Sequence, residues 1–295
     1  MLRKECIIVA GPTAVGKTAF AIDLAERHNT VIISADSRQL YRELNIGVAR
    51  PSIEELRRVK HYCIASHSIT ENVSAASFAR EATMYLEELF KSHDTVVICG
   101  GTGLYIKALT EGLDEIPETP ATIRENVNEI YASQGLEGLI HELDMLDPSF
   151  KAGHDINNPR RVMRALEVVM HTGLSIRHFQ KGINLSSSWK EMGYDFKYII
   201  MDLPREILYA RINARVDQMI AAGLEEEVYS LKELSHLPAL KTVGYSEFFD
   251  FFEGKTTRED AIEKIKQHTR NYAKRQITWF NKVRSTLTEE MIYKG

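Results

Sequence analysis

The stretch Gly11–Thr18, GPTAVGKT, constrains the fold of this chain more than any other part of its sequence. It matches the pattern G-x-x-x-x-G-K-[ST] and lies between an apolar run, CIIVA at residues 6–10, and a helical pattern that starts at Lys17. In this motif the glycines let backbone N–H groups point at a phosphate, and the start of the helix adds partial positive charge. The sequence therefore predicts a strand–loop–helix unit that binds a di- or triphosphate.

Three further short runs rich in Val and Ile predict buried strands, at residues 30–35, 95–100 and 196–203. Runs of this length that are apolar throughout are typical of parallel strands with helices on both faces. Helical patterns follow the first and the third of the four predicted strands. This alternation predicts an α/β fold of the P-loop kind, with a parallel sheet flanked by helices.

Residues 113–194 contain separate helical patterns at residues 122–133, 136–146 and 159–171, several prolines and no convincing strand. We expect this region to be an all-helical insertion domain within an α/β core made of residues 1–112 and 195–295. The end of the chain also predicts a long helix, for which Thr256 and Glu259 would form a capping box.

Composition places the protein among globular proteins of the cytoplasm. No apolar run in the 295 residues approaches the roughly 20 residues that a membrane span needs. Cys6, Cys63 and Cys99 form no disulfide pattern, and the spacing of His61, Cys63 and His67 suits no common zinc site. The net charge of −4 neither requires nor excludes a nucleic acid partner.

An acidic residue is expected near a phosphate loop, and its place in this chain is unusual. The run at residues 95–100 is followed by glycine and not by an acid, whereas the run at residues 30–35 leads directly into Asp36. The ends of parallel strands point into one crevice, so Asp36 should lie near the phosphates. It could bind a metal, cap a loop or act as a base. Such a site could transfer a phosphoryl group, or hold a diphosphate while something else is transferred.

Six motifs in this order resemble the tRNA dimethylallyltransferase (tRNA isopentenyltransferase) family over nearly the whole chain. They are GPTAVGKT, DSRQLY, GGTGLY, NNPRRVMRALEV, KTVGYSE and TRNYAKRQITWF. The resemblance implies transfer of the dimethylallyl group from dimethylallyl diphosphate to N6 of the adenosine beside the tRNA anticodon, with release of diphosphate and with Mg²⁺ as cofactor. The partners would be the tRNA anticodon stem-loop and the isoprenoid donor, and we expect a monomer.

The resemblance and the chemistry together give the expected site residues. Catalytic roles are expected for Asp36 as general base, Thr102, Lys17 and Arg215, with Arg211 as a rival to Arg215. The diphosphate is expected on Gly11, Thr13, Ala14, Val15, Gly16, Lys17 and Thr18, and Mg²⁺ on Thr18. Contacts with tRNA are expected from Asp36, Ser37, Arg38, Gln39, Thr102, Arg124, Arg160, Arg161, Arg164, Lys241, Gly244, Tyr245, Lys274 and Arg275.

Helical spacing supports part of this tRNA set. Arg160 and Arg164 share one face of a predicted helix, while Val162 and Leu166 share another that should pack inward. The chain also departs from the family pattern, with Val15 where Ser is frequent, GVARP at residues 47–51 where G-T-A-K-P is common, and Asn158 where Asp is frequent.

Three other functions are compatible with the phosphate loop. A small-molecule or nucleoside kinase would explain the loop and Asp36, but not the basic helices. An RNA-binding protein switched by nucleotide would bind RNA without modifying it. A prenyltransferase acting on free adenine nucleotides would not need the basic clusters.

Overall fold

The chain forms two compact units in the computed structural model, which describes residues 4–150, 156–182 and 186–293. The first unit contains the described residues up to Glu111 and those from residue 186 onward. The second unit contains the described residues between these two segments of the sequence. The second unit ends about ten residues before the expected limit at 194. Helix α7 (Ser186–Glu191) belongs to the first unit, because Trp189 is buried there and its Nε1 donates to the Leu109 carbonyl at 2.9 Å.

The first unit contains a five-stranded parallel sheet in the order β3-β2-β4-β1-β5. The strands are β1 (Lys4–Ala10), β2 (Ile32–Ser34), β3 (His61–Tyr62), β4 (Thr95–Gly100) and β5 (Tyr194–Ile200). The predicted fold is confirmed, because the four apolar runs form β1, β2, β4 and β5, of which the first three are inner strands and β5 lies at an edge. Strand β3 was not predicted, since two residues give no periodic signal.

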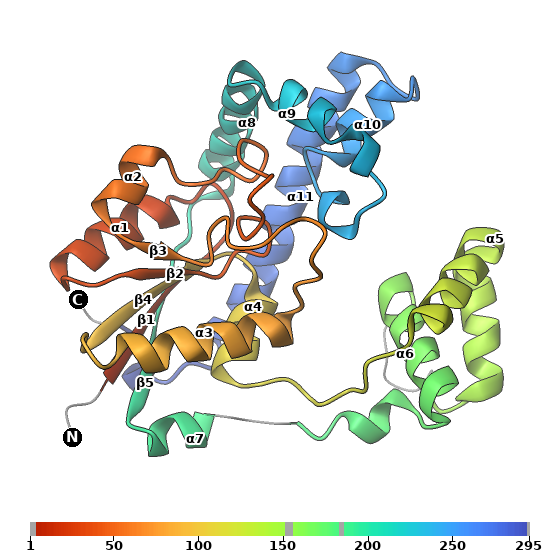
Figure 1. The fold of residues 1–295 in the computed structure, drawn as a ribbon, viewed down its shortest axis with the longest axis horizontal. Helices are drawn as coiled ribbons and strands as arrows, with labels where there is room; N and C mark the ends of the chain where they lie inside the picture. Colours follow the sequence, from red (N-terminus) through yellow and green to blue (C-terminus); the bar gives the residue numbers. More distant parts are fainter. Residues whose placement is uncertain (1–3, 151–155, 183–185, 294–295) are drawn as a thin grey trace. The chain divides into compact units, whose positions relative to one another are not determined.

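Helices cover both faces of this sheet (Figure 1). The connection from β1 to β2 runs toward one edge of the sheet, and that from β3 to β4 runs back, so right-handed crossovers place their helices on opposite faces. The helices of this unit besides α7 are α1 (Lys17–Arg27), α2 (Ile53–Arg58), α3 (Ala75–Leu89), α4 (Gly103–Thr110), α8 (Arg205–Ala221), α9 (Leu224–Ser230), α10 (Ser246–Phe252) and α11 (Arg258–Arg284).

Helix α11 begins one residue later than the predicted capping box allows. Its N-cap is Thr257, whose side chain accepts a hydrogen bond from the Asp260 backbone at 3.1 Å. Thr256 therefore lies outside the helix. A row of two threonines offers two equivalent caps, and packing of the helix decides between them.

The second unit consists of α5 (Ala121–Leu146) and α6 (Pro159–Thr172), followed by a 3₁₀ turn at Ile176–Phe179. Gly135, with φ of 66°, interrupts α5, as the two separate helical patterns in this stretch predicted. Val127, Leu139, Val162 and Leu166 are fully buried between the two helices. Among the described residues of the whole chain, no helix is long and apolar enough to cross a membrane.

Candidate active site

The phosphate loop joins β1 to α1. Gly16 is the N-cap of α1 with φ of 106°, a backbone conformation that favours glycine, and Lys17 and Thr18 open the helix. The Lys17 Nζ donates to the Pro12 carbonyl at 2.7 Å, which holds the ammonium across the loop. Burial lowers the pKa of Lys17 to about 8, against the opposing effects of Cys99 and Asp36. The loop therefore combines backbone donors, a helix start and a cation in one place.

Asp36 follows β2 and organises the loop behind it. Its Oδ1 accepts hydrogen bonds from the backbone N–H groups of Arg38 at 2.9 Å and Gln39 at 3.4 Å. One carboxylate oxygen of Asp36 thus caps the loop. Loop capping was one of the three roles that the sequence left open for Asp36, beside metal binding and general-base catalysis. Its charge also acts on Lys17, so the carboxylate lies beside the phosphate loop.

Thr102 lies at the start of α4 and fixes the loop after Asp36. Its Oγ1 accepts from the Ser37 N–H at 3.0 Å, and its own N–H donates to the Ala35 carbonyl at 3.2 Å. Tyr272 of α11 lies close to Thr102, and burial raises the pKa of Tyr272 to about 12. Thr102 therefore orients Asp36 through the neighbouring residue Ser37.

Gln276 of α11 connects the phosphate loop to the loop that carries Thr102. The Thr13 N–H donates to its Oε1 at 2.8 Å, and its Nε2 donates to the Gly101 carbonyl at 2.9 Å. A Cβ atom at Gly101 would approach Gln276 Nε2 to 2.3 Å, so glycine is required for this close contact. Sequence reasoning missed Gln276, although it lies in the same basic helix segment as the predicted Lys274 and Arg275.

The side chains of Arg38 and Gln39 have partners within the protein. Arg38 Nη1 donates to the Ala239 carbonyl at 3.1 Å, and Gln39 Nε2 donates to the carbonyls of Val48 at 3.3 Å and Ala49 at 3.0 Å. Both residues are half-buried beside Asp36. In this conformation Gln39 holds the segment at residues 48–49 in place, and its amide group is turned away from solvent partners.

Two arginines of α8 lie near the phosphate loop. Arg211 is exposed, and its Nη1 contacts the Val15 carbonyl at 3.5 Å. Arg215 is more buried; burial lowers the pKa of its guanidinium, and Glu55 raises it. Its positive charge acts on Lys17. The environment of Arg215 thus fits a diphosphate partner better than that of Arg211.

The arginines predicted to contact tRNA differ in exposure within the second unit. Arg160 and Arg161 are exposed near the start of α6, and Arg124 is half-buried on the first turn of α5. Arg164 is tied down, because it donates to Thr119 Oγ1 at 2.7 Å, to the Pro117 carbonyl at 2.9 Å and to Glu167 at 3.2 Å. Asn158 accepts from the Arg161 N–H as the N-cap of α6, a role that Asp would fill equally well.

Tyr245 belongs to the predicted tRNA set but lies in the interior. It is fully buried, and its hydroxyl donates to Glu227 Oε1 at 2.6 Å. The preceding Gly244 is buried as well, with φ of 96°. In this conformation the Tyr245 ring is enclosed by the protein and exposes no surface to a partner, so its contact with RNA stays a prediction. Lys241 is exposed, as a residue that contacts tRNA has to be.

Lys274 and Arg275 are exposed on α11, and the Arg275 guanidinium lies 5.6 Å from the centre of the Tyr272 ring. Because Tyr272 also contacts Thr102, this basic and aromatic set lies next to the loop of Asp36. Arg275 therefore lies on the same face of α11 as Tyr272, whereas Lys274 is exposed on another face of the helix.

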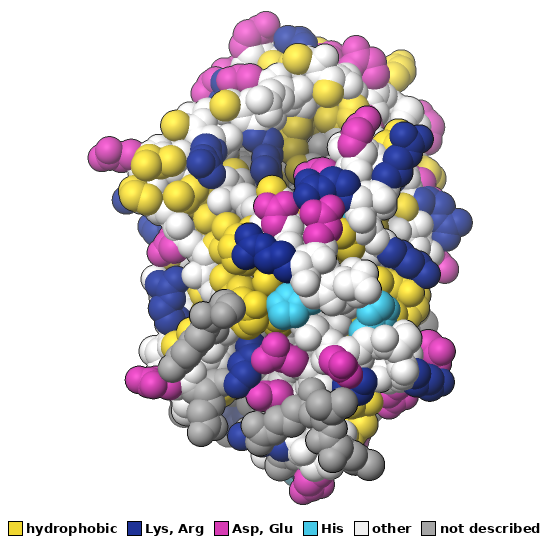
Figure 2. Space-filling view, turned by 90° about the vertical axis from the view of Figure 1, so that its left-hand side faces the viewer, with side chains coloured by type: hydrophobic (Ala, Val, Ile, Leu, Met, Phe, Trp, Pro, Cys, Tyr) yellow, Lys and Arg dark blue, Asp and Glu magenta, His cyan; other side chains and the backbone are white. Residues whose placement is uncertain are grey.

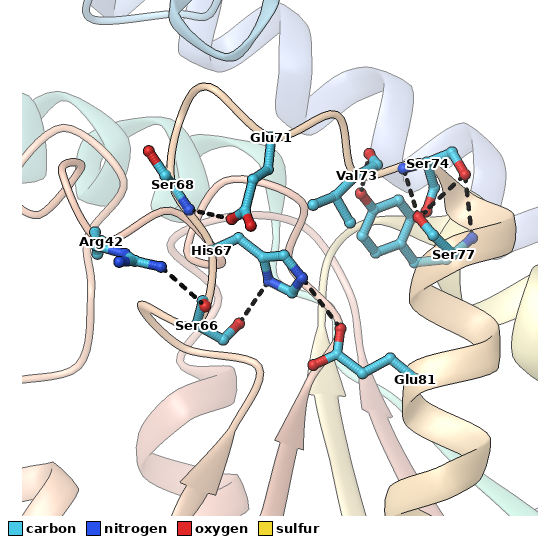
Figure 3. Close-up of polar contacts among 10 residues, drawn as sticks. Arg42, Ser66, His67, Ser68, Glu71, Val73, Ser74, Ser77 and Glu81 are labelled. Atoms are coloured by element: carbon cyan, nitrogen blue, oxygen red, sulfur yellow. Dashed lines mark hydrogen bonds and ion pairs between the residues drawn. The ribbon is translucent and has the colours of Figure 1, made fainter.

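The segment between β3 and α3 is held by side chains that were considered as metal ligands. His67 Nδ1 contacts Ser66 Oγ at 2.9 Å, and His67 Nε2 lies 3.5 Å from Glu81 of α3 (Figure 3). His61 Nδ1 donates to the Val59 carbonyl at 2.8 Å. The two histidines thus have different protein partners.

Comparisons with known proteins place this geometry in one family. Residues 39–283 match the family model described as IPP transferase. A tRNA dimethylallyltransferase of Cytophaga hutchinsonii is 46% identical over 281 residues, which cover 95% of this chain and 91% of that protein. One from Christiangramia forsetii is 45% identical over 94% of this chain and 90% of its own length. The solved tRNA isopentenylpyrophosphate transferase of Bacillus halodurans is 35% identical, with a TM-score of 0.65, over 95% of this chain and 87% of that one.

Proposed function

This chain belongs to the IPP transferase family and is a prenyltransferase acting on tRNA, and we propose that its phosphate loop binds the diphosphate of dimethylallyl diphosphate. The acceptor in this proposal is N6 of the adenosine adjacent to the anticodon. The family match supports prenyl transfer over the kinase alternative. The reaction on tRNA makes the cytoplasm its expected location.

The observation that carries the proposal is the position of Asp36 beside Lys17. The Asp36 carboxylate follows β2 and acts on the Lys17 ammonium, while β4 ends at Gly100 and is followed by Gly101, with no acid there. A base placed next to a diphosphate clamp can accept a proton from a nucleophile that attacks the carbon bonded to that diphosphate. This arrangement suits alkyl transfer with diphosphate as leaving group.

The adenine amino group is a weak nucleophile because its lone pair is delocalised into the ring. In the proposed step, Asp36 accepts the N6 proton as nitrogen bonds to the allylic carbon and the bond from that carbon to the diphosphate oxygen breaks. Negative charge then grows on the leaving diphosphate, where the Lys17 ammonium, the Arg215 guanidinium and the loop N–H groups stabilise it. Ser37 and Thr102 keep the carboxylate loop in place.

The residues of the loop fit Mg²⁺. The Thr18 hydroxyl, on the first turn of α1, would hold the ion together with diphosphate oxygens, since Mg²⁺ prefers oxygen ligands and retains waters. When bound, Mg²⁺ supplies further positive charge to the diphosphate.

To reach Asp36, the target adenosine has to leave the stack of the anticodon loop, as bases modified by enzymes do. The exposed Arg160, Arg161, Lys274 and Arg275 are the proposed contacts with the tRNA backbone, and Arg124 and Lys241 extend this set. Their contribution would be largely electrostatic and would fall with salt concentration.

Mass analysis of tRNA nucleosides tests the proposal. Folded protein is incubated with unmodified tRNA, Mg²⁺ and dimethylallyl diphosphate, and the expected product is an adenosine heavier by one dimethylallyl group. Parallel reactions replace the donor by ATP, or the tRNA by a free adenine nucleotide. The assignment would be rejected if a modified product formed only with ATP as donor or only with the free adenine nucleotide as acceptor. It would also be rejected if protein that binds tRNA formed no prenylated adenosine.

A further inference from the structure

A second basic pocket lies in the first unit, apart from the phosphate loop. Its volume is about 420 Å³, and it is lined by Arg50, Leu56, Arg57, Lys60, His61, Ile64 and Ala65. These residues come from α2 and from the segments on either side of it. The face of the molecule on which α1 and α2 lie carries many Lys and Arg side chains, with histidines near its middle (Figure 2). The size is within the usual range for small-molecule sites.

Arg50 is a pre-positioned cation in this pocket. Its Nη2 donates to the carbonyls of Tyr41 and Arg42, both at 2.9 Å, and to that of Leu44. These three bonds fix the plane of the guanidinium, and among the described residues no acceptor contacts Nη1. A guanidinium that is fixed in this way loses little entropy when it binds an anion.

Arg57 and Lys60 add two cations that lack acidic partners. The adjacent Arg58 shows the contrast, because it pairs with Asp23 at 2.9 Å and Glu26 at 2.8 Å on α1. No such ion pair involves Arg57 or Lys60 within the described part of the chain. The Lys60 Nζ lies 4.6 Å from the centre of the Tyr62 ring. The lining of the pocket thus includes three cations and no carboxylate, and the acids that act on it, Glu43 and Glu227 on Arg50 and Glu55 on His61, lie outside the lining.

The pocket is connected to the loop of Asp36 through Gln39. The Ala65 N–H donates to the Gln39 carbonyl at 2.9 Å, and Gln39 Nε2 donates to the carbonyl of Ala49, which precedes Arg50. Glu55 of α2 acts electrostatically on both His61 in the pocket and Arg215 beside the phosphate loop. The second pocket is thus a neighbour of the site that holds the diphosphate.

We propose that this pocket is an accessory site for a prenyl diphosphate, distinct from the phosphate loop. Arg50, Arg57 and Lys60 would bind the diphosphate group, because charge-assisted contacts suit phosphate oxygens. Leu56 and Ile64 supply an apolar wall for the five-carbon chain, which a site for phosphate alone would not need. This inference rests on the proposed function for its ligand, and binding of the diphosphate product in place of the donor is an outcome that the experiment distinguishes.

The experiment uses the variant Lys17→Ala, which weakens binding at the phosphate loop, so that binding at the pocket can be measured by itself. Isothermal titration with dimethylallyl diphosphate, and separately with inorganic pyrophosphate, should detect weak binding to Lys17→Ala. Addition of Arg57→Gln and Lys60→Gln to that variant should abolish the remaining binding. Arg58→Gln is the control for Arg57→Gln, since each removes one positive charge from α2 and Arg58 is outside the pocket, and it should leave the remaining binding unchanged.

Kinetics in the otherwise unaltered protein identify the source of the diphosphate. If the pocket serves the donor, Arg57→Gln with Lys60→Gln should raise the donor KM about tenfold and leave kcat and tRNA affinity unchanged, because two charge-assisted contacts are lost. If it serves the product, the same variant should weaken inhibition by pyrophosphate at an unchanged donor KM. Either result supports a diphosphate site.

Two outcomes would overturn the inference. One is that Lys17→Ala binds neither compound, which leaves no site outside the phosphate loop. The other is that Arg57→Gln with Lys60→Gln weakens tRNA binding while binding of the donor and of pyrophosphate stays normal, which would make the pocket a contact for RNA phosphate. Failure of the proposed function would look different, because the unaltered protein would then form no prenylated tRNA whatever the pocket binds.

Discussion

Truncation of Gln276 to alanine should disturb the phosphate loop from a distance. The side chain is only 5% exposed, and it satisfies both the Thr13 N–H and the Gly101 carbonyl. Each buried group left without a partner costs about 1–3 kcal/mol, so the loss of both partners in Gln276→Ala should lower the free energy of unfolding by about 2–6 kcal/mol. For a protein of this size this corresponds to a fall of about 3–10 °C in Tm.

The isosteric change Gln276→Glu tests how charge at this position affects the phosphate loop, because the size of the side chain stays the same. The oxygen that accepts from Thr13 is kept, but an ionised carboxylate would place a second oxygen against the Gly101 carbonyl and a negative charge beside the diphosphate. We expect the donor KM to rise more than kcat falls, and both to recover partly at lower pH, where a protonated carboxyl can donate again.

Thermal unfolding and steady-state kinetics of both variants measure these effects. Gln267→Ala is the control, because it removes the same side chain from an exposed position of the same helix. If Gln276→Ala keeps the Tm and the donor KM of the unaltered protein, the two hydrogen bonds do not position the loop.

Four more predictions concern single residues. Asp36→Asn keeps an oxygen to cap the loop but loses the base, so single-turnover transfer should fall at least about a hundredfold with tRNA affinity unchanged in filter binding; a near-normal rate would place the base elsewhere. Because the pKa of Lys17 is about 8, donor binding should be strongest below pH 8 and weaken as the ammonium loses its proton above it; Lys17→Arg should bind the donor independently of pH in titrations from pH 7 to 10, and equal pH profiles would refute this reasoning. Arg164→Ala should destabilise the helical unit by about 1–3 kcal/mol in urea unfolding, whereas Arg160→Ala should only reduce the salt dependence of tRNA binding; the reverse pattern would exchange their roles. Tyr245→Phe should lower stability by about 1–2 kcal/mol through Glu227 and leave tRNA affinity unchanged, and a loss of affinity at normal stability would restore it to the RNA surface.

Much of the fold could be predicted because its signals are local. The spacing of Gly11, Gly16 and Lys17 defines the loop, and four short apolar runs define four strands. The interruption of α5 at Gly135 was visible as a gap between two helical patterns. The limit of the insertion was less accurate, because the packing of Trp189 against the sheet unit leaves no mark in its own sequence segment.

The site was only partly visible in the sequence. Lys17 and Thr18 open the helix after the loop that follows β1, and Asp36 follows β2, so both lie at the same end of the sheet and their meeting could be expected. Gln276, by contrast, acts on Thr13, which is 263 positions away, and a long-range hydrogen bond has no local pattern. Arg164 and Tyr245 look like surface residues in a motif, but only the folded chain shows that their polar groups already have partners.

The position of β1 between β4 and β5 has a consequence for how the protein folds during synthesis. Glu5 pairs with Thr95, and Lys4 pairs with Tyr194, so this strand has to wait for both neighbours to leave the ribosome. The helical unit is synthesised before β5, and its own contacts are all closer along the chain. We therefore expect it to fold first during translation, while the unfinished sheet with an open edge beside β1 depends on chaperones.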